Sequence, residues 1–322
     1  MTLRRAASPW ITVLTYHRIA PANAAAALDD GVVDARPEQL EKQLAFVKRW
    51  FRPVGIDDLL AHANGERSLP RNPALVTFDD GYRDNHDVAL PILLRHGIRA
   101  TFFVSTDFIE RRRLFWWDRV ARVLKRSPRD RIAMEYPQHL EWALRGPVAR
   151  RAAIRRALRI IKDVPQLDVE RFLDEIERAA GFALGAEEER RLVDETVMTW
   201  EHVVALRRAG MDVQSHTRTH RVLQTLGPAE LTDELEGSRK TLEAVLGERV
   251  RAISYPVGKP LRSLPAVRDA VRKAGYELGF SNGTGVSTAA RLDPLDVKRI
   301  SLDVDLSEPF FRAMVALPWL AY

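Results

Sequence analysis

The stretch ALVTFDDG, residues 74–81, decides the fold of this chain. Five apolar or β-branched residues run without a break and end in Asp79, Asp80 and a glycine. Such a short run is typical of a strand that is buried on both faces of a parallel sheet. Two carboxylates at its end are costly to bury unless a positive group lies beside them. Aspartate before glycine also favours a turn, so the pair alone does not distinguish a site from a turn.

Strands and helices alternate on both sides of this stretch. We predict further strands at 10–15, 100–104, 211–215, 250–255, 276–280 and 296–300. Helical patterns cover 36–51, 57–63, 86–96, 201–209, 228–246 and 264–274, and a turn is predicted at 281–285. This alternation predicts an α/β fold with a parallel sheet.

The alternation is interrupted between about residues 110 and 197. This segment is rich in arginine, for example at Arg111–Arg113, and its apolar residues lie at helical spacing. We therefore expect a helical insertion in a single domain that spans residues 10–322. The aromatic run at residues 115–117 either stacks on sugar rings or packs in the core.

Composition limits the chemistry and the partners. The 322 residues include no cysteine, so a metal would have to be held by histidine, aspartate or glutamate. The formal net charge is +6, which indicates either attraction to lipid headgroups, acidic glycans or nucleic acid, or simply a solvated basic surface.

The same sequence gives an expectation about location. The basic N-terminus has no hydrophobic segment after it, and no stretch reaches the length of a membrane span. We expect a cytoplasmic or inner-membrane-associated protein, with a periplasmic location as the alternative. The apolar stretch 309–322 is interpreted either as a packed terminal helix or as an interfacial anchor.

Polar side chains recur where the predicted strands end. The carboxyl ends of parallel strands open on one mouth, and we expect these side chains to converge there. They are His17, Asp79, Asp80, His216, His220 and Asn282.

Three of these residues form a metal-ligand pattern. His216 and His220 are four residues apart and can reach one ion. With Asp80 they make a two-histidine, one-carboxylate set that suits Zn²⁺ or a similar ion. Asp79 would then lie beside the metal's water, within reach of its proton.

Two motifs resemble those of the polysaccharide deacetylases, the NodB-homology or carbohydrate esterase family 4 group. TFDDG at 77–81 resembles the first motif, and SHTRTH at 215–220 resembles the second. The resemblance covers about residues 11–110 and 198–302, and it implies a distorted (β/α) barrel. It also implies that Asp79 is the catalytic base, with a divalent metal on Asp80, His216 and His220. Zn²⁺ is expected, with Co²⁺ or Ni²⁺ as alternatives.

Other motifs depart from the family pattern. The third motif usually has Arg-x-Pro and an aromatic residue, but residues 254–259 read SYPVGK, so the arginine that would orient the base is missing. Tyr255, Pro256 and Asn282 are predicted to bind substrate, and a backbone N–H near Tyr255 or Val257 is predicted to hold the oxyanion.

The general acid also departs from that pattern. The fifth motif usually supplies a histidine, and residues 297–300 have none. The stretch TYHRI at 15–19 instead resembles the N-terminal Tyr-His motif of the poly-N-acetylglucosamine deacetylase branch. We therefore expect His17 to be the general acid, and its alternative is a hydrogen-bonded structural histidine.

The resemblance implies a metal-dependent hydrolase that removes N-acetyl groups from an N-acetylglucosamine-type glycan, in exopolysaccharide or cell-envelope glycan biosynthesis. The expected partner is this glycan and not nucleic acid, and peripheral membrane association is left open. One alternative is a catalytically inactive glycan-binding module on the same fold, for which the missing arginine leaves room. The other is an amidase that acts on a non-sugar C–N bond.

Overall fold

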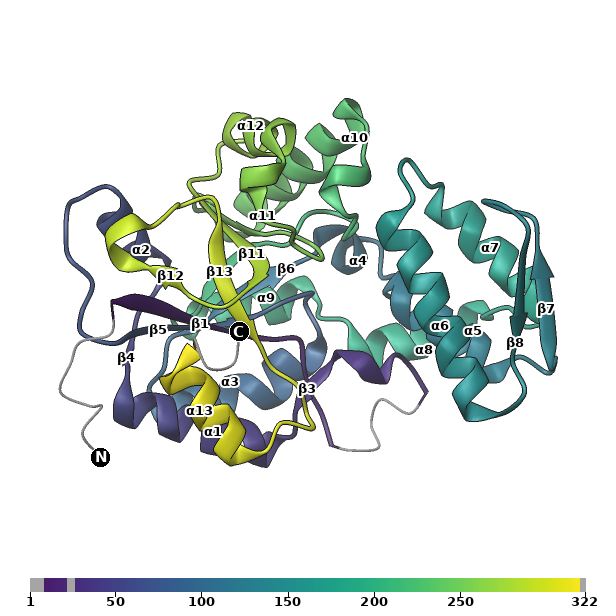
Figure 1. Cartoon of the computed structure of the whole chain (residues 1–322), viewed down its shortest axis with the longest axis horizontal. Coiled ribbons are helices and arrows are strands. Elements are labelled where there is room, and N and C mark those ends of the chain that lie inside the picture. Colours follow the sequence, from purple (N-terminus) through teal and green to yellow (C-terminus); the bar gives the residue numbers. More distant parts are fainter. Residues whose placement is uncertain (1–8, 22–26, 319–322) are drawn as a thin grey trace.

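Seven parallel strands close into a barrel (Figure 1). The computed structural model describes residues 9–21 and 27–318. The pairing of β1 with β5, in which Thr12 lies opposite Ala74 and Tyr16 opposite Phe78, closes the sheet. Around the ring the order is β1 (Trp10–Tyr16), β13 (Val297–Ser301), β11 (Leu278–Thr284), β10 (Ala252–Ser254), β9 (Asp212–Ser215), β6 (Thr101–Val104) and β5 (Pro73–Phe78). The predicted distorted (β/α) barrel is confirmed.

Helices surround this ring, and short strands extend it. The helices are α1 (Pro37–Trp50), α2 (Ile56–Ala63), α3 (Leu90–His96), α9 (Trp200–Arg208), α10 (Pro228–Thr232), α11 (Ser238–Leu246), α12 (Pro265–Lys273) and α13 (Glu308–Ala316). Outside the ring, β4 (Arg52–Pro53) pairs with β5, and β12 (Ser287–Thr288) pairs antiparallel with β1. A separate two-stranded sheet joins β2 (Arg18–Ile19) to β3 (Val33–Ala35).

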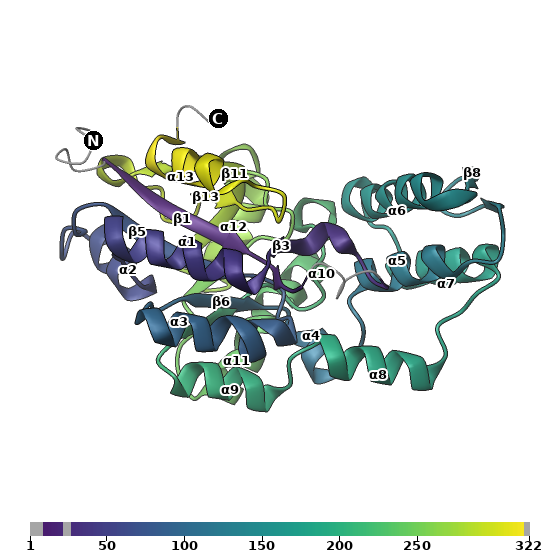
Figure 2. The ribbon, with the colours of Figure 1, turned by 90° about the horizontal axis from the view of Figure 1, so that it is seen from below.

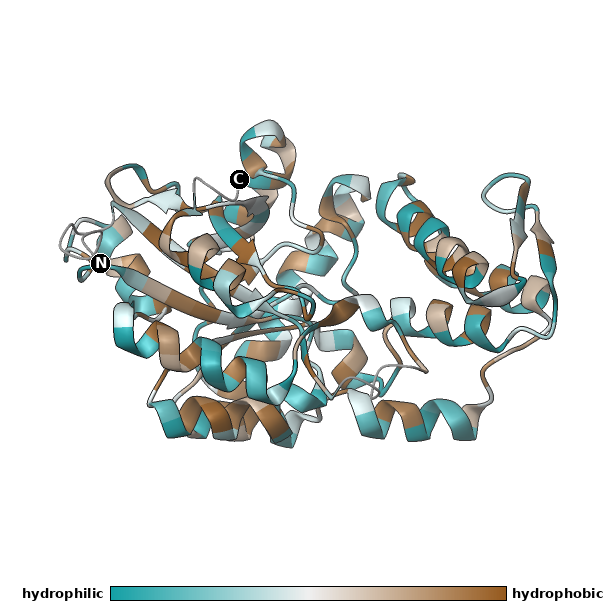
Figure 3. Ribbon diagram, turned by 60° about the horizontal axis from the view of Figure 1, so that its bottom comes forward, coloured by the Kyte–Doolittle hydropathy of each residue, from teal (hydrophilic) through white to brown (hydrophobic). Residues whose placement is uncertain are grey.

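Side chains along each strand alternate between the barrel interior and the surrounding helices. One buried cluster combines Val13, Leu75, Phe103 and Phe280 with Leu59 of α2, and it fills the interior. Their neighbours along the strands pack under the outer helices in the main core. Figure 3 shows hydrophobic residues concentrated on the strands and on part of each helix. The inward-facing residues at the carboxyl ends of the strands therefore determine which side chains line the mouth of the barrel.

The segment between β6 and α9 forms a lobe beside the barrel (Figures 1 and 2). It starts at α4 (Thr106–Glu110), and its elements are α5 (Trp116–Arg126), β7 (Arg131–Met134), β8 (Leu140–Ala143), α6 (Gly146–Asp163), α7 (Val169–Ala180) and α8 (Ala186–Thr196). The antiparallel β7–β8 hairpin was not predicted. The lobe's apolar residues belong to the same buried cluster as the barrel's outer layer, which joins the two parts through a continuous core.

Two predicted elements differ in detail. Residues 228–246 run as α10, a π turn at Asp233–Gly237 and α11. Residues 281–285 were predicted as a turn, but β11 continues to Thr284, with an irregular register between Ser281 and Thr284. Asn282 therefore lies on a barrel strand and not in a turn.

The predictions of no export signal and of a C-terminal packed helix or membrane anchor concern the two ends of the chain. In α13 (Glu308–Ala316) the side chains of Phe311, Met314 and Val315 are buried, so the described part of the stretch 309–322 contains a packed helix. Residues 319–322, and residues 1–8 on which the prediction of no export signal partly rests, lie outside the described ranges. Within 9–21 and 27–318, the helices lack the combination of length and apolar composition that a membrane span needs.

Candidate active site

The apolar interior of the barrel gives way to polar side chains at the carboxyl ends of the strands. Each of these polar residues stands two positions after another inward-facing residue of the same strand, because every second side chain of a strand points to the same face. Val297 is followed by Arg299, and Ala252 by Ser254. The polar residues of this layer are Asp79, His216, Ser254, Asn282 and Arg299.

The predicted metal ligands come together. The Nε2 atoms of His216 and His220 lie 3.3 Å and 3.4 Å from Oδ1 of Asp80. All three residues are buried. Two ligand atoms at Zn²⁺ distances and a tetrahedral angle would stand about 3.3 Å apart, so the spacing fits a small divalent ion.

Hydrogen bonding prepares these atoms for a cation. Oδ1 of Asp80 is buried and has no hydrogen-bond partner among the described residues. Nδ1 of His216 lies 2.8 Å from the carbonyl oxygen of Ser254, so it donates there and leaves the Nε2 lone pair facing Asp80. Burial lowers the pKa of His220 to about 3, which keeps its ring uncharged at neutral pH. The donor set therefore suits a metal ion.

The backbone is strained at the same place. Asp80, Thr217 and His220 have φ values of 77°, 65° and 55°, in the left-handed region that residues with a side chain rarely adopt. Such conformations cost about 1–3 kcal/mol each and tend to persist at functional sites. The strain directs the ligand side chains of two different loops toward one point.

Asp79 is held by a buried arginine, and this corrects the prediction that the orienting arginine is missing. Nη1 of Arg299, on β13, donates to both carboxylate oxygens of Asp79 at 2.9 Å and 2.8 Å. Ser254 Oγ donates to Asp79 Oδ2 at 2.9 Å. The guanidinium comes from the segment 297–300, the part of the chain where the family pattern predicts a histidine. Its place two residues after the inward Val297 was the signal that could have identified it.

These contacts keep Asp79 ionised. Burial alone would raise the pKa of Asp79, but the charge of Arg299 together with those of His216 and His17 outweighs burial, and the pKa lies below its ordinary value. Burial would also raise the pKa of Asp80, yet its neighbour His216 and the positive charge of His17 hold the pKa well below the usual range. Two adjacent carboxylates thus remain charged for different reasons.

His17 lies at the mouth with a carboxylate partner that sequence reasoning missed. Its Nδ1 is 2.8 Å from Oδ2 of Asp34, on β3, and its side chain is 25% exposed. Burial would lower the pKa of His17, but Asp34, with a further contribution from Asp80 and Asp79, raises it to about 9. His17 is therefore protonated at neutral pH. Asp34 could not be found by spacing, since it reaches the site through the pairing of β2 with β3.

The three residues predicted to bind substrate lie at the mouth in different ways. Tyr255 is buried, its hydroxyl donates to the Leu295 carbonyl at 3.0 Å, and its N–H donates to Phe280. Its side chain is therefore a core residue and its N–H already has an acceptor, so of the two predicted oxyanion donors Val257 alone stays a prediction. Pro256 is buried beside it. Asn282 is partly exposed, and its Oδ1 accepts from Nη2 of Arg299.

The aromatic run of the insertion packs against the predicted metal ligand His220. Trp116 and Trp117 are 5% and 4% exposed, so they belong to the core and are not an open sugar platform. Their rings lie 5.9 Å and 4.6 Å from the His220 ring, centre to centre. The insertion thus supports one wall of the candidate site.

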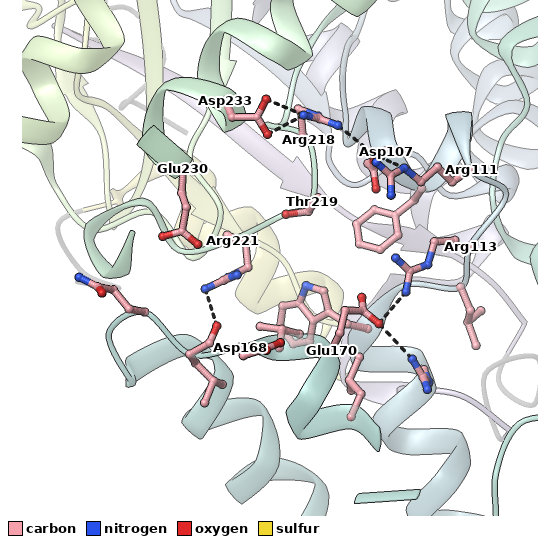
Figure 4. A pocket seen from close by; sticks show the side chains of 18 of the residues that line it. Asp107, Arg111, Arg113, Asp168, Glu170, Arg218, Thr219, Arg221, Glu230 and Asp233 are labelled. Carbon is pink, nitrogen blue, oxygen red and sulfur yellow. Dashed lines mark hydrogen bonds and ion pairs between the residues drawn. The ribbon is translucent and has the colours of Figure 1, made fainter. Parts of the chain in front are cut away.

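A pocket of about 560 Å³ adjoins this wall, and Trp116 lines it. Figure 4 shows the charged side chains that surround the pocket, among them Arg113, Glu170 and Arg218. It lies between the insertion and the barrel loop that carries Arg218 and Arg221. Its charges are largely paired: Arg113 meets Glu170 at 2.7 Å, and Arg218 meets Asp107 at 3.2 Å. A lining of paired charges beside an aromatic ring suits a neutral, hydroxyl-rich ligand.

A second group of potential ligands, His86, Asp87 and His202, lies outside the barrel mouth and is more exposed. Nδ1 of His202 accepts the Thr199 N–H at the start of α9, and Nδ1 of His86 faces Asp87 at 2.8 Å. These atoms already have partners, unlike Oδ1 of Asp80. The group serves as a control for the metal site.

A family model, polysaccharide deacetylase, matches residues 66–132 and 171–279 of the chain. Among curated proteins, the putative polysaccharide deacetylase YxkH of Bacillus subtilis (strain 168) is 21% identical over 214 residues. The match covers 66% of this chain and 46% of the relative, so the chain spans about half the length of that protein.

Solved structures share the fold at low sequence identity. The Streptococcus pyogenes deacetylase PplD in complex with acetate has a TM-score of 0.61 at 18% identity, and the match covers 96% of this chain and 99% of that one. IcaB from Ammonifex degensii has a TM-score of 0.57 at 17% identity, with 96% and 97% covered. The de-N-acetylase from Aggregatibacter actinomycetemcomitans has a TM-score of 0.57 at 14% identity, with 94% and 98% covered.

Replacing Arg299 by methionine should lower the free energy of unfolding by about 3–5 kcal/mol at neutral pH, because Asp79 stays buried without its cation. Urea denaturation with a chelator present measures this change. The wild-type contribution of Asp79 is present above its unfolded pKa and is lost as the pH falls through its lowered folded pKa. The deficit should therefore shrink in acid. The double variant D79N/R299M should recover much of the loss, and additive losses would contradict a direct coupling.

Zn²⁺ should raise the melting temperature of the wild-type protein but not of His216→Ala or His220→Ala. At a free ion concentration 100 times Kd, binding adds about 2.7 kcal/mol of stability. Differential scanning fluorimetry with and without Zn²⁺ measures the shift. His86→Ala is the matched control and should keep it; loss of the shift in that variant alone would place the ion at the outer group.

Proposed function

The chain belongs to the polysaccharide deacetylase family, and we propose that it is a metal-dependent hydrolase that removes N-acetyl groups from an N-acetylglucosamine-type glycan. The observation that carries the proposal is the buried, unpartnered Oδ1 of Asp80. It lies between two histidine Nε2 atoms, directly beside an ion-paired Asp79. A cation-binding carboxylate next to an ionised base is an arrangement suited to metal-assisted hydrolysis of an amide.

Asp80, His216 and His220 would hold the metal. When bound, a divalent cation supplies a Lewis acid that polarises an amide carbonyl and makes a water more acidic. The donor set of two imidazoles and one carboxylate favours Zn²⁺, with Co²⁺ or Ni²⁺ as alternatives. Donation by the Nδ1–H of His216 to Ser254 fixes which nitrogen faces the ion.

The chain's own residues move the protons. Asp79, held ionised by Arg299, accepts a proton from the water that attacks the acetamide carbon. The N–H of Val257 is proposed to stabilise the negative charge that develops on the carbonyl oxygen. His17, protonated through Asp34, gives its proton to the amine nitrogen as the C–N bond breaks. Acetate and a free amine are the products.

The substrate is proposed to be a glycan chain and not a single sugar. The pocket beside Trp116 has a volume that accommodates a further sugar residue, and its paired charges suit a neutral one. A role in exopolysaccharide or cell-envelope glycan biosynthesis would supply such a chain. Arg299 removes the argument for an inactive glycan-binding module, since the base keeps its orienting cation.

Acetate release from N-acetylglucosamine oligomers of increasing length tests the proposal. Release should require added Zn²⁺ or Co²⁺ and should rise with chain length. An absence of release with the metal bound would favour the glycan-binding alternative, and release only from non-sugar acetamides would favour an amidase.

Replacing Asp79 by asparagine should lower kcat by about 10²–10⁴-fold, because the general base is removed. Steady-state acetate release measures the loss. The Zn²⁺-induced rise in melting temperature should remain, since Asp80, His216 and His220 are untouched. Turnover near the wild-type level would show that another group takes the proton.

Replacing Asp34 by asparagine should move the basic limb of the kcat–pH profile to lower pH. Asp34 raises the pKa of His17 to about 9, so the acid form persists through neutral pH. Without that carboxylate the pKa falls toward the ordinary value of about 6.5. The pH profiles of wild type, Asp34→Asn and His17→Ala measure this. A limb at the same pH in wild type and Asp34→Asn would exclude His17 as the acid.

A further inference from the structure

Helix α6 (Gly146–Asp163) presents an exposed face of four arginines: Arg151, Arg155, Arg156 and Arg159. The opposite face, which includes Ile154 and Ile161, is buried against the rest of the insertion. The helix is therefore fixed in one orientation, and its basic face points outward.

These four arginines have no acidic partner among residues 9–21 and 27–318. Most other arginines of the insertion do. Arg111, Arg112 and Arg113, which the sequence singles out, pair with Asp107, Asp194 and Glu170, respectively. The unpaired positive charge of the insertion therefore lies on α6 and not at residues 111–113.

The arrangement is unfavourable for the isolated helix. Arg151, Arg155 and Arg159 follow one another at a spacing of four residues, which makes them neighbours on the helix surface. Like charges at this spacing destabilise a helix. An anionic partner would offset this repulsion between the arginines. The described part of the chain supplies no such partner for them.

The face has the shape of a docking surface and not of a pocket for one ion. The four arginines, Val148 and Ala152 line one shallow hollow. Arg151 and Arg159 stand about 12 Å apart along the helix axis, which is wider than a single phosphate. Val148 is 73% exposed and adds an apolar side chain at the same surface.

We propose that this face of α6 docks on an anionic lipid bilayer. A row of arginines beside an exposed aliphatic side chain matches a surface that offers both headgroup charge and an apolar layer beneath it. Nucleic acid fits less well, because the hollow lacks an aromatic side chain on which bases could stack. The α6 face is separate from the residues of the candidate active site, so the proposal does not depend on the deacetylase function.

Co-sedimentation of the full chain with vesicles tests the proposal. Binding to vesicles of phosphatidylglycerol and phosphatidylcholine should exceed binding to pure phosphatidylcholine, and 0.5 M salt should weaken it. Each arginine near such a surface contributes about fivefold to the affinity. The variant R151Q/R155Q/R156Q/R159Q should therefore lose at least about a hundredfold.

The matched control is R131Q/R145Q/R178Q/R191Q. It removes the same charge from exposed arginines of the insertion that are paired with carboxylates. This control should keep most of the binding, and both variants should keep the melting temperature within a few degrees. Equal loss in both variants would show that only net charge matters. Failure to bind anionic vesicles, or loss of duplex DNA binding in the α6 variant without any vesicle binding, would overturn the proposal.

Discussion

The structure depends on the compensation of charge at the mouth of a closed barrel. Two carboxylates follow β5 into a space that apolar strands surround, where an unpaired charge is costly. Arg299 meets that requirement for Asp79 through two hydrogen bonds. Asp80 has no such partner: beside its Oδ1 lie two imidazole nitrogens, and the ring of His220 is uncharged at neutral pH. The protein therefore pairs one aspartate with its own cation and leaves the other as a candidate ligand for a cation from solution.

Local pattern in the sequence was enough for the barrel strands, most of the surrounding helices and the three residues that lie together as a candidate metal site. Several barrel strands, such as β1, β5 and β6, are short apolar runs, and Asp80 and His216 come within two residues of a strand end. Closure of the ring could not be predicted in the same way. It depends on the pairing of β1 with β5, which are far apart in sequence, and both strands read equally well in an open sheet. The β7–β8 hairpin was missed because its four-residue strands lie among strong helical patterns.

The missed site residues share a physical reason. In a closed barrel every strand sends inward side chains to the same mouth, so a guanidinium can reach Asp79 from several strands. The third motif, near Pro256, gives no indication of an arginine on β13 that could reach Asp79. Asp34 reaches His17 through a two-stranded sheet with only three residues in β3, too short to give a pattern. The position of the family motifs predicts neither residue. The alternation of inward and outward side chains along β13 does predict that Arg299 points into the barrel.

The insertion carries two kinds of charge, and partners distinguish them. Around the pocket beside Trp116, arginines and carboxylates neutralise one another and tie the insertion to the barrel loop that bears the ligand His220. These pairs fix the wall of the site, so the insertion contributes to the geometry of the candidate metal ligands. On α6 the arginines face outward and have no carboxylate partner within the described part of the chain, and charge left free at a cost to helix stability is available to a partner. An enzyme whose substrate is assembled at a membrane would need both properties, a rigid site and a surface that keeps it near the bilayer.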